Sequence, residues 1–165
     1  MNILLLGATG SIGDSVLSVI EENHSELNLF GITFHKNINK SQEIIKDFKP
    51  EFAYVEDRST FEDQKDTSDI TFLNGDSSLK ELIEHDDVDV IISAISGFAG
   101  LKATYLAAST GKKILLANKE SIVAGGDLIT ARAKKFNSKI IPIDSEHNAI
   151  FQCLSGEKSP DDVQK

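Results

Sequence analysis

The stretch GATGSIG, residues 7–13, connects an apolar run, ILLL at residues 3–6, to SVLSVIEE at residues 15–22, whose apolar residues have helical spacing. A tight turn needs only one or two glycines, whereas this junction has three. Between a strand and a helix, the first glycine permits a sharp turn, the second lets the backbone approach a pyrophosphate, and the third allows close helix packing. Free N–H groups at the start of such a helix attract phosphates. The stretch therefore predicts a nucleotide-binding loop, although its GxxGxxG spacing also fits a tight turn without a ligand.

The rest of the chain alternates between predicted strands and predicted helices. Seven apolar segments have the length and composition of strands: residues 2–6, 27–34, 52–55, 70–73, 88–94, 113–116 and 139–143. Helical spacing predicts helices at residues 12–22, 40–48, 98–109, 122–136 and 146–154, a short one around Phe61, and one over residues 79–85 with Asp76 as its N-cap. Continuous apolar strands separated by helices are typical of a parallel sheet covered on both faces. The predicted fold class is α/β, a doubly wound parallel sheet of the Rossmann type.

The length of the chain suits one domain. A chain of 165 residues can bury a single full hydrophobic core, and it is too short for two large ones. We expect a Rossmann-type NADP-binding domain over residues 1–154. The remaining residues, 155–165, are polar and lack apolar periodicity, which predicts a tail or a linker.

Composition and charge exclude several classes of protein. The chain has 17 Lys and Arg against 26 Asp and Glu, a formal net charge of −9, so it lacks the basic surface of a nucleic-acid-binding protein. A small anionic ligand is compatible with this charge, because surface charges beyond about 8 Å are largely screened. No apolar run approaches the roughly 18 residues of a membrane span, and the single cysteine, Cys153, cannot form an internal disulfide. We therefore expect a cytoplasmic protein that binds neither nucleic acid nor membrane.

The end of the predicted second strand indicates which dinucleotide would bind. A site that prefers NAD usually has Asp or Glu there, which accepts a hydrogen bond from the ribose 2′-hydroxyl. This chain instead has His35, Lys36 and Asn37. The Lys36 ammonium suits a 2′-phosphate, so the sequence favours NADP over NAD. A solvent-exposed loop lysine is the alternative.

Polar or glycine-rich segments follow five of the predicted strands. In a parallel sheet, these segments all lie at the carboxyl edge, where ligands bind. The segments are GATGSIG, HKN, ISGFAG, ANKES and DSEHN. In ANKES, Lys119 lies between Asn118 and Glu120 just before a predicted helix, where its ammonium could hold a phosphate or a substrate oxygen. Equally, Ser121 could cap that helix while Glu120 favours its positive end.

The segment DSEHN, residues 144–148, carries candidate metal ligands. Asp144 and Glu146 are two residues apart, so in an extended segment both carboxylates point to one side and could share a divalent ion. Hard oxygen ligands suit Mg²⁺ or Mn²⁺. A capping aspartate followed by an acidic first turn explains the same residues without any metal. His147 could be a ligand or a proton carrier, but a single histidine beside a helix start is more often structural, and we assign it no role.

Three segments together resemble one known family. GATGSIG, LLANKES at residues 115–121 and PIDSEHNAIFQCL at residues 142–154 are similar, in this order, to the N-terminal part of 1-deoxy-D-xylulose 5-phosphate reductoisomerase. The last two segments are far more specific than the glycine loop, and the resemblance extends over residues 1–154. Members of this family rearrange 1-deoxy-D-xylulose 5-phosphate and reduce the aldehyde intermediate with NADPH, giving 2-C-methyl-D-erythritol 4-phosphate for isoprenoid synthesis. The resemblance therefore implies an NADPH-dependent oxidoreductase that also uses Mg²⁺ or Mn²⁺.

The resemblance also implies roles for individual residues. The positions that match cofactor-binding residues of the family are Thr9, Gly10, Ser11, Ile12, Lys36, Asn37, Asn118 and Glu120, together with His35, where the family often has glycine. That substitution leaves open whether the His35 side chain itself contacts the cofactor. Lys119 and Glu146 match catalytic positions. Lys119, Ser145 and Glu146 match substrate-binding positions, and Asp144 and Glu146 match the metal ligands.

Family members are more than twice as long as this chain. In the family, the further polypeptide supplies another glutamate ligand to the metal, the pocket for the substrate phosphate, a mobile loop and a C-terminal helical domain. We therefore expect a truncated protein that binds NADPH and is inactive alone. The family is commonly dimeric through that further part, so we expect a monomer. A plastid-type compartment would replace the cytoplasm in a eukaryote. Two alternatives are another NADP-dependent oxidoreductase and a non-catalytic module that senses nucleotides.

Overall fold

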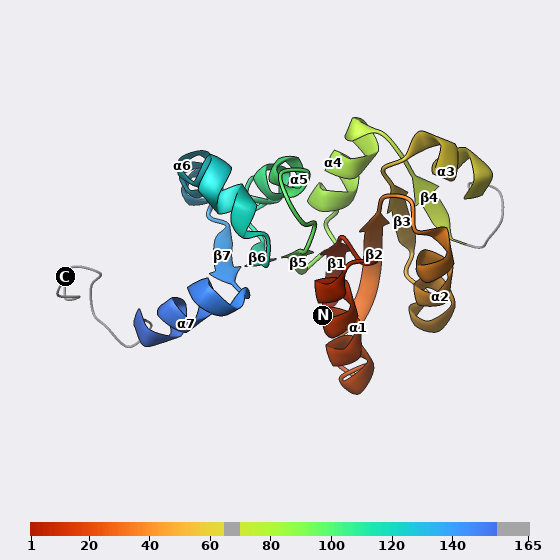
Figure 1. Cartoon of the computed structure of the whole chain (residues 1–165), viewed down its shortest axis with the longest axis horizontal. Coiled ribbons are helices and arrows are strands. Elements are labelled where there is room, and N and C mark those ends of the chain that lie inside the picture. The colour runs from red at the N-terminus through yellow and green to blue at the C-terminus, as the bar shows by residue number, and fades with distance from the viewer. Residues whose placement is uncertain (65–69, 155–165) are drawn as a thin grey trace.

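Seven strands form one sheet in which every pair of neighbouring strands is parallel (Figure 1). The computed structural model describes residues 1–64 and 70–154. The strands are β1 (Asn2–Leu6), β2 (Asn28–Phe34), β3 (Phe52–Val55), β4 (Thr71–Leu73), β5 (Val90–Ser93), β6 (Lys113–Leu116) and β7 (Lys139–Pro142). They lie in the order β4-β3-β2-β1-β5-β6-β7. The predicted fold class is confirmed, and the predicted strands differ from these only by small shifts at their ends.

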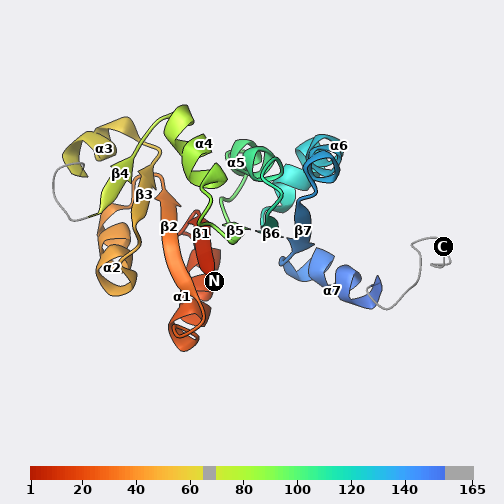
Figure 2. The ribbon, with the colours of Figure 1, turned by 180° about the vertical axis from the view of Figure 1, so that it is seen from behind.

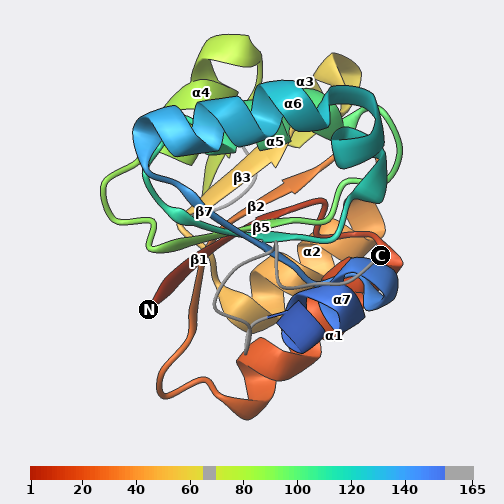
Figure 3. The ribbon, with the colours of Figure 1, turned by 90° about the vertical axis from the view of Figure 1, so that its left-hand side faces the viewer.

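Helices cover both faces of the sheet (Figures 2 and 3). They are α1 (Ser11–Glu22), α2 (Ile38–Phe48), α3 (Arg58–Gln64), α4 (Asp76–Glu84), α5 (Gly100–Ala107), α6 (Lys119–Phe136) and α7 (Ser145–Leu154). α4, α5 and α6 lie on one face, and α1, α2 and α7 lie on the other (Figure 3). Among the residues that the structure describes, no helix is long and apolar enough to cross a membrane.

The apolar residues of the strands form two cores, one on each face of the sheet. Along β1, Ile3 and Leu5 pack with α1 and α2, whereas Leu4 and Leu6 pack with α4, α5 and α6. All four side chains are at most 3% exposed. Because successive side chains of a strand point to opposite faces, a strand buried on both faces must be apolar throughout. This explains why the strands were recognisable in the sequence.

The largest differences in helix starts are at α4 and α6, each of which begins three residues before the predicted start. Asp76 does not cap α4: Gly75 occupies the N-cap position with a φ of +88°, and Asp76 is the first residue of the helix. Glycine adopts that conformation without a Cβ clash, and an aspartate in the first turn still favours the positive end of the helix dipole. α6 begins at Lys119, earlier than predicted, because the Asn118 side chain caps it. The predicted tail, residues 155–165, lies outside the described residues.

The glycine loop holds α1 tightly against the sheet. Gly7 has a φ of +88°, and a Cβ atom there would lie 2.8 Å from the carbonyl oxygen of Ala94, just after β5. The Gly7 N–H also donates to the hydroxyl of Thr33 on β2, at 2.9 Å. A Cβ atom at Gly13 would lie 2.2 Å from the carbonyl oxygen of Ala8. The first and third glycines therefore have the predicted roles of sharp turn and close packing.

The position of β1 in the sheet creates a crevice. β1 pairs with β2 on one side and with β5 on the other. The crossover through α1 leads to β2, whereas β5 continues through α5 to β6 in the opposite direction. In open parallel sheets, ligands bind where the strand order reverses in this way. The fold thus places the glycine loop at the expected binding position.

We predict that Gly13→Ala lowers the free energy of unfolding by about 3 kcal/mol, because the added methyl group overlaps backbone that cannot move freely. Gly126→Ala is the matched control. Gly126 lies inside α6, and the nearest heavy atom to a Cβ there is the Ile122 Cγ2 at 3.5 Å, an ordinary contact. That variant should be more stable than wild type by about 0.5–1 kcal/mol. Urea denaturation followed by circular dichroism measures both values. Equal stabilities of the two variants would contradict the packing role of Gly13.

Candidate functional site

Two adjoining cavities lie at the carboxyl edge of the sheet. The first, of about 480 Å³, is lined by the glycine loop and by residues at the ends of β2, β3 and β5. The second, of about 370 Å³, is lined by Ile12 and by residues that follow β5, β6 and β7. Residues 94–96, just after β5, line both cavities. The segments predicted to converge therefore surround one continuous crevice.

The glycine loop and the start of α1 form the centre of this crevice. Thr9 and Gly10 line the first cavity, and Ile12 lines the second. Ser11 is exposed. Gly10 is the N-cap of α1, and no side chain makes a capping hydrogen bond there. The first N–H groups of α1 are thus available to an anion, and the helix dipole favours negative charge at this point.

The three predicted residues after β2 have different environments. His35 lines the first cavity. Lys36 extends outward, with 64% of its side chain exposed, and its Nζ lies 3.5 Å from Oδ1 of Asp57. Asn37 caps α2, since its Oδ1 accepts the N–H of Lys40 at 3.3 Å.

Acidic residues after β3 were missed by the sequence analysis. Glu56 lines the first cavity together with Tyr54, whose hydroxyl donates to Glu56 Oε2 at 2.9 Å. Burial, and then the hydrogen bond to Glu56, raise the pKa of Tyr54, so its phenol stays protonated. Backbone hydrogen bonds from Glu56 to Phe34 and from Asp57 to His35 continue the pairing of the two strands beyond their ends. These acids could have been found from their position in the sequence, because they directly follow a parallel strand, as the five segments predicted to form the site do.

Asn118 connects the two loops that border the second cavity. Its side chain is buried, with 2% of the residue exposed. Its Nδ2 donates to the carbonyl oxygen of Gly97 at 2.8 Å and also to that of Ile95, while its Oδ1 accepts the N–H of Ser121 at 2.7 Å. Asn118, and not Ser121, therefore caps α6. Close packing against Gly100 restricts the amide further, because a Cβ there would lie 2.3 Å from Asn118 Nδ2.

Lys119 and Glu146 face each other across the second cavity. Lys119 Nζ lies 3.8 Å from Glu146 Oε1, and the side chains are 55% and 70% exposed. An ion pair with this exposure contributes little stability. Both groups are therefore free to change partners when a ligand enters. Glu120 lines the same cavity from the first turn of α6.

Asp144 is held more firmly than Glu146. Its side chain is 12% exposed, and its Oδ2 accepts the backbone N–H of His147 at 3.2 Å and the His147 Nδ1 at 2.6 Å. Because a carboxylate only accepts, the second contact places a proton on Nδ1. Asp144 thus caps α7, and Ser145 begins that helix at the cavity wall.

The acidic pair, Asp144 and Glu146, receives no further ligand from the part of the chain that the structure describes. Within residues 1–64 and 70–154, no cluster of three or more His, Cys, Asp or Glu could hold a metal ion. Asp144 and Glu146 nevertheless line one cavity. They could supply two oxygen ligands, with water and substrate oxygens completing the coordination that Mg²⁺ prefers.

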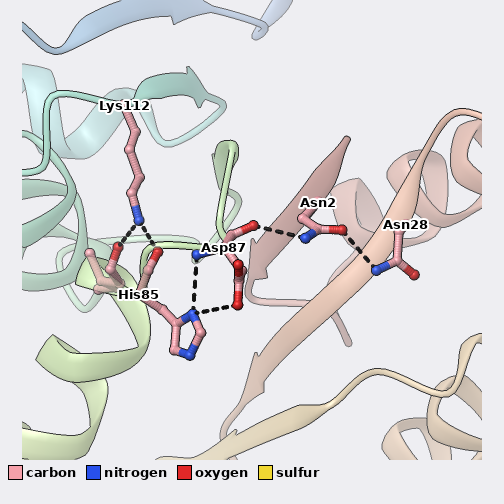
Figure 4. A network of polar contacts seen from close by, with 6 residues as sticks. Asn2, Asn28, His85, Asp87 and Lys112 are labelled. Atoms are coloured by element: carbon pink, nitrogen blue, oxygen red, sulfur yellow. Dashed lines mark hydrogen bonds and ion pairs between the residues drawn. The ribbon is translucent and has the colours of Figure 1, made fainter.

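A second polar network lies at the opposite, amino edge of the sheet (Figure 4). Lys112 Nζ donates to the carbonyl oxygen of Ile83 at 3.2 Å and to that of His85, at the end of α4. Burial lowers the pKa of Lys112. Asn2 and Asn28 join β1 to β2 in the same network, at 3.0 Å. The bonds join the end of α4 to the start of β6, and β1 to β2, so they hold elements of the fold together at this edge.

Comparisons with known proteins identify relatives of the chain. A family model described as 1-deoxy-D-xylulose 5-phosphate reductoisomerase matches residues 3–126. A protein of that name from Francisella tularensis subsp. novicida (strain U112) is 49% identical over 153 residues, which are 92% of this chain and 40% of the relative. This chain therefore spans well under half the length of that relative.

Solved structures of reductoisomerases share the fold of this chain. A DOX-P reductoisomerase in complex with NADPH, fosmidomycin and magnesium has a TM-score of 0.88 and 42% identity, covering 93% of this chain and 39% of its own. The reductoisomerase from Zymomonas mobilis in complex with NADPH has a TM-score of 0.85 and 37% identity, covering 92% and 41% of the two chains.

We predict that Asn118→Ala destabilises the protein more than a simple loss of a helix cap. The substitution removes the cap of α6 and leaves two carbonyl groups without their donor, which should cost about 3 kcal/mol. Asn37→Ala removes only the cap of α2 and should cost about 1 kcal/mol. Urea denaturation of both variants provides the comparison. Similar losses would show that the bonds to Ile95 and Gly97 contribute nothing.

Proposed function

Because this chain belongs to the 1-deoxy-D-xylulose 5-phosphate reductoisomerase family, we propose that it binds NADPH in the two cavities at the carboxyl edge of its sheet. The chain would be the NADPH-binding part of an enzyme that rearranges 1-deoxy-D-xylulose 5-phosphate and reduces it to 2-C-methyl-D-erythritol 4-phosphate. The observation that carries the proposal is the uncapped start of α1, which opens onto a crevice shared by both cavities. Two solved relatives are described as complexes with NADPH.

The cofactor would lie across the crevice with its pyrophosphate at the glycine loop. Backbone N–H groups around Gly10, Ser11 and Ile12 would donate to the phosphate oxygens, and the Thr9 hydroxyl would assist. The adenosine half would enter the first cavity beside His35. The Lys36 ammonium and Asn37, just beyond, would face the 2′-phosphate.

The nicotinamide half would extend into the second cavity. There Glu120 and Asn118 border the available space. Asn118 would act mainly by position, because its polar side-chain atoms already bond within the chain. The cofactor supplies the hydride when bound, so the chain's own task is to orient the ring and to exclude water.

The substrate would bind beside Lys119, Ser145 and Glu146. The Lys119 ammonium would hold a substrate oxygen, and Asp144 and Glu146 would hold Mg²⁺ or Mn²⁺. Such an ion supplies Lewis-acid stabilisation of the charge that develops on substrate oxygens. Two carboxylates form a weak site, so further ligands would come from the substrate and from polypeptide outside the matched part. We therefore propose that the chain alone does not turn over substrate. We also propose that it is a monomer and that its compartment is the cytoplasm.

We predict that the chain binds NADPH and that Lys36→Ala weakens this binding about tenfold, because one charge-assisted contact to the 2′-phosphate is lost. NADH affinity should stay unchanged. Lys46→Ala, which removes the same charge from the last turn of α2, should affect neither cofactor. Titration followed by nicotinamide fluorescence gives all the dissociation constants. Equal affinity of the wild-type chain for NADPH and NADH would contradict the assignment of Lys36.

We also predict weak, millimolar binding of Mn²⁺ by the isolated chain, because only two carboxylates are available. Glu146→Gln should weaken it at least about fivefold, whereas Asp127→Asn on the exposed side of α6 should not. Water proton relaxation of Mn²⁺ solutions measures this binding without any turnover. Equal losses in the two variants would indicate non-specific attraction to a negatively charged protein.

A further inference from the structure

The ion pair between Lys36 and Asp57 lies beside the first cavity, where the proposed function places the cofactor 2′-phosphate. Lys36 follows His35, and Asp57 follows Glu56; His35 and Glu56 both line the cavity. The pair joins the loop after β2 to the loop after β3, with 3.5 Å between Lys36 Nζ and Asp57 Oδ1. The lysine is therefore paired with an anion of its own chain.

Asp57 is the fixed partner of this pair. Its Oδ2 accepts the hydroxyl of Ser59 at 2.5 Å, and the N–H and the hydroxyl of Thr60, both at 3.0 Å, at the start of α3. The Ser59 hydroxyl, followed by Thr60, holds the pKa of the Asp57 carboxyl well below its usual range. The carboxylate therefore stays charged and stays in place, while Oδ1 faces Lys36.

Lys36 is the mobile partner. Its side chain is 64% exposed, compared with 21% for Asp57. A lysine ammonium on a flexible stem acts as a point charge without a preferred geometry. The exposed pair with Asp57 is weak, whereas a phosphate close to a dianion attracts an ammonium more strongly than a single carboxylate does.

We propose that Asp57 is a specificity-determining residue that competes with the cofactor 2′-phosphate for Lys36 and thereby limits the preference for NADPH over NADH. When NADPH binds, Lys36 moves from Asp57 to the phosphate, so breaking the ion pair offsets part of the gain from the new contact. NADH has a hydroxyl at this position, so Lys36 remains with Asp57. The inference rests on the proposed NADPH site, and it concerns a residue outside the predicted set.

Asp57→Asn tests this competition in the full 165-residue chain. Asparagine caps helices as well as aspartate does, so the start of α3 should be kept while the charge is removed. We expect NADPH to bind about threefold to tenfold more tightly, with NADH unchanged. Glu84→Gln is the matched control: Glu84 also pairs with a lysine, Lys80, at 3.8 Å, but at the far end of α4. It should alter neither affinity.

Repeating the substitution in a Lys36→Ala background shows whether Asp57 acts through the lysine. The gain in NADPH affinity should then largely disappear. A gain of the same size in both backgrounds, weaker NADPH binding by Asp57→Asn, or an equal change for NADPH and NADH would each overturn the inference. If wild type binds NADPH but Asp57→Asn leaves the NADPH-to-NADH ratio unchanged, only this inference fails. If wild type does not bind NADPH, the proposed function fails as well.

Discussion

The close approach of Gly7 to the end of β5 is the contact on which the crevice depends. The chain must leave β1 between two parallel neighbours, and Gly7 turns there with a φ of +88°. Only a residue without a Cβ fits this turn, because a Cβ would lie 2.8 Å from the carbonyl oxygen of Ala94. The same residue donates to Thr33 on β2. One turn therefore fixes β1, β2 and β5 relative to one another. Gly13 then lets α1 pack closely against Ala8, so the first residues of the helix border the crevice.

Asn118 performs the corresponding task on the other side of the crevice. Its amide joins the carbonyl groups after β5 to the first turn of α6, so the border of the second cavity and the position of Lys119 depend on one buried side chain. A direct polar contact to a cofactor would require the amide to give up one of these bonds. The family resemblance alone would assign such a contact. In the structure, the Asn118 side chain bonds to the two loops, and the residue also borders the second cavity.

The fold was largely predictable from sequence because burial on both faces forces apolar strands, and because glycine spacing has few physical explanations. Helix starts were less predictable. Asp76 and Ser121 have good capping chemistry, but backbone conformation at Gly75 and the tertiary bonds of Asn118 decided where the helices begin. Asp57 was missed for a related reason. The sequence showed no acid at the end of the second strand. Pairing of β2 with β3 nevertheless places Asp57, from the end of the third strand, beside Lys36.

The charges at the carboxyl edge explain how an acidic protein could accept anionic ligands. Several lysines near helix starts at this edge pair with an acid from a neighbouring segment: Lys36 with Asp57, Lys40 with Asp14, Lys102 with Asp76, and Lys119 with Glu146. Each lysine is thus held near the crevice without leaving an uncompensated positive charge. Exposed pairs are weak, so a ligand phosphate can take the lysine at little cost.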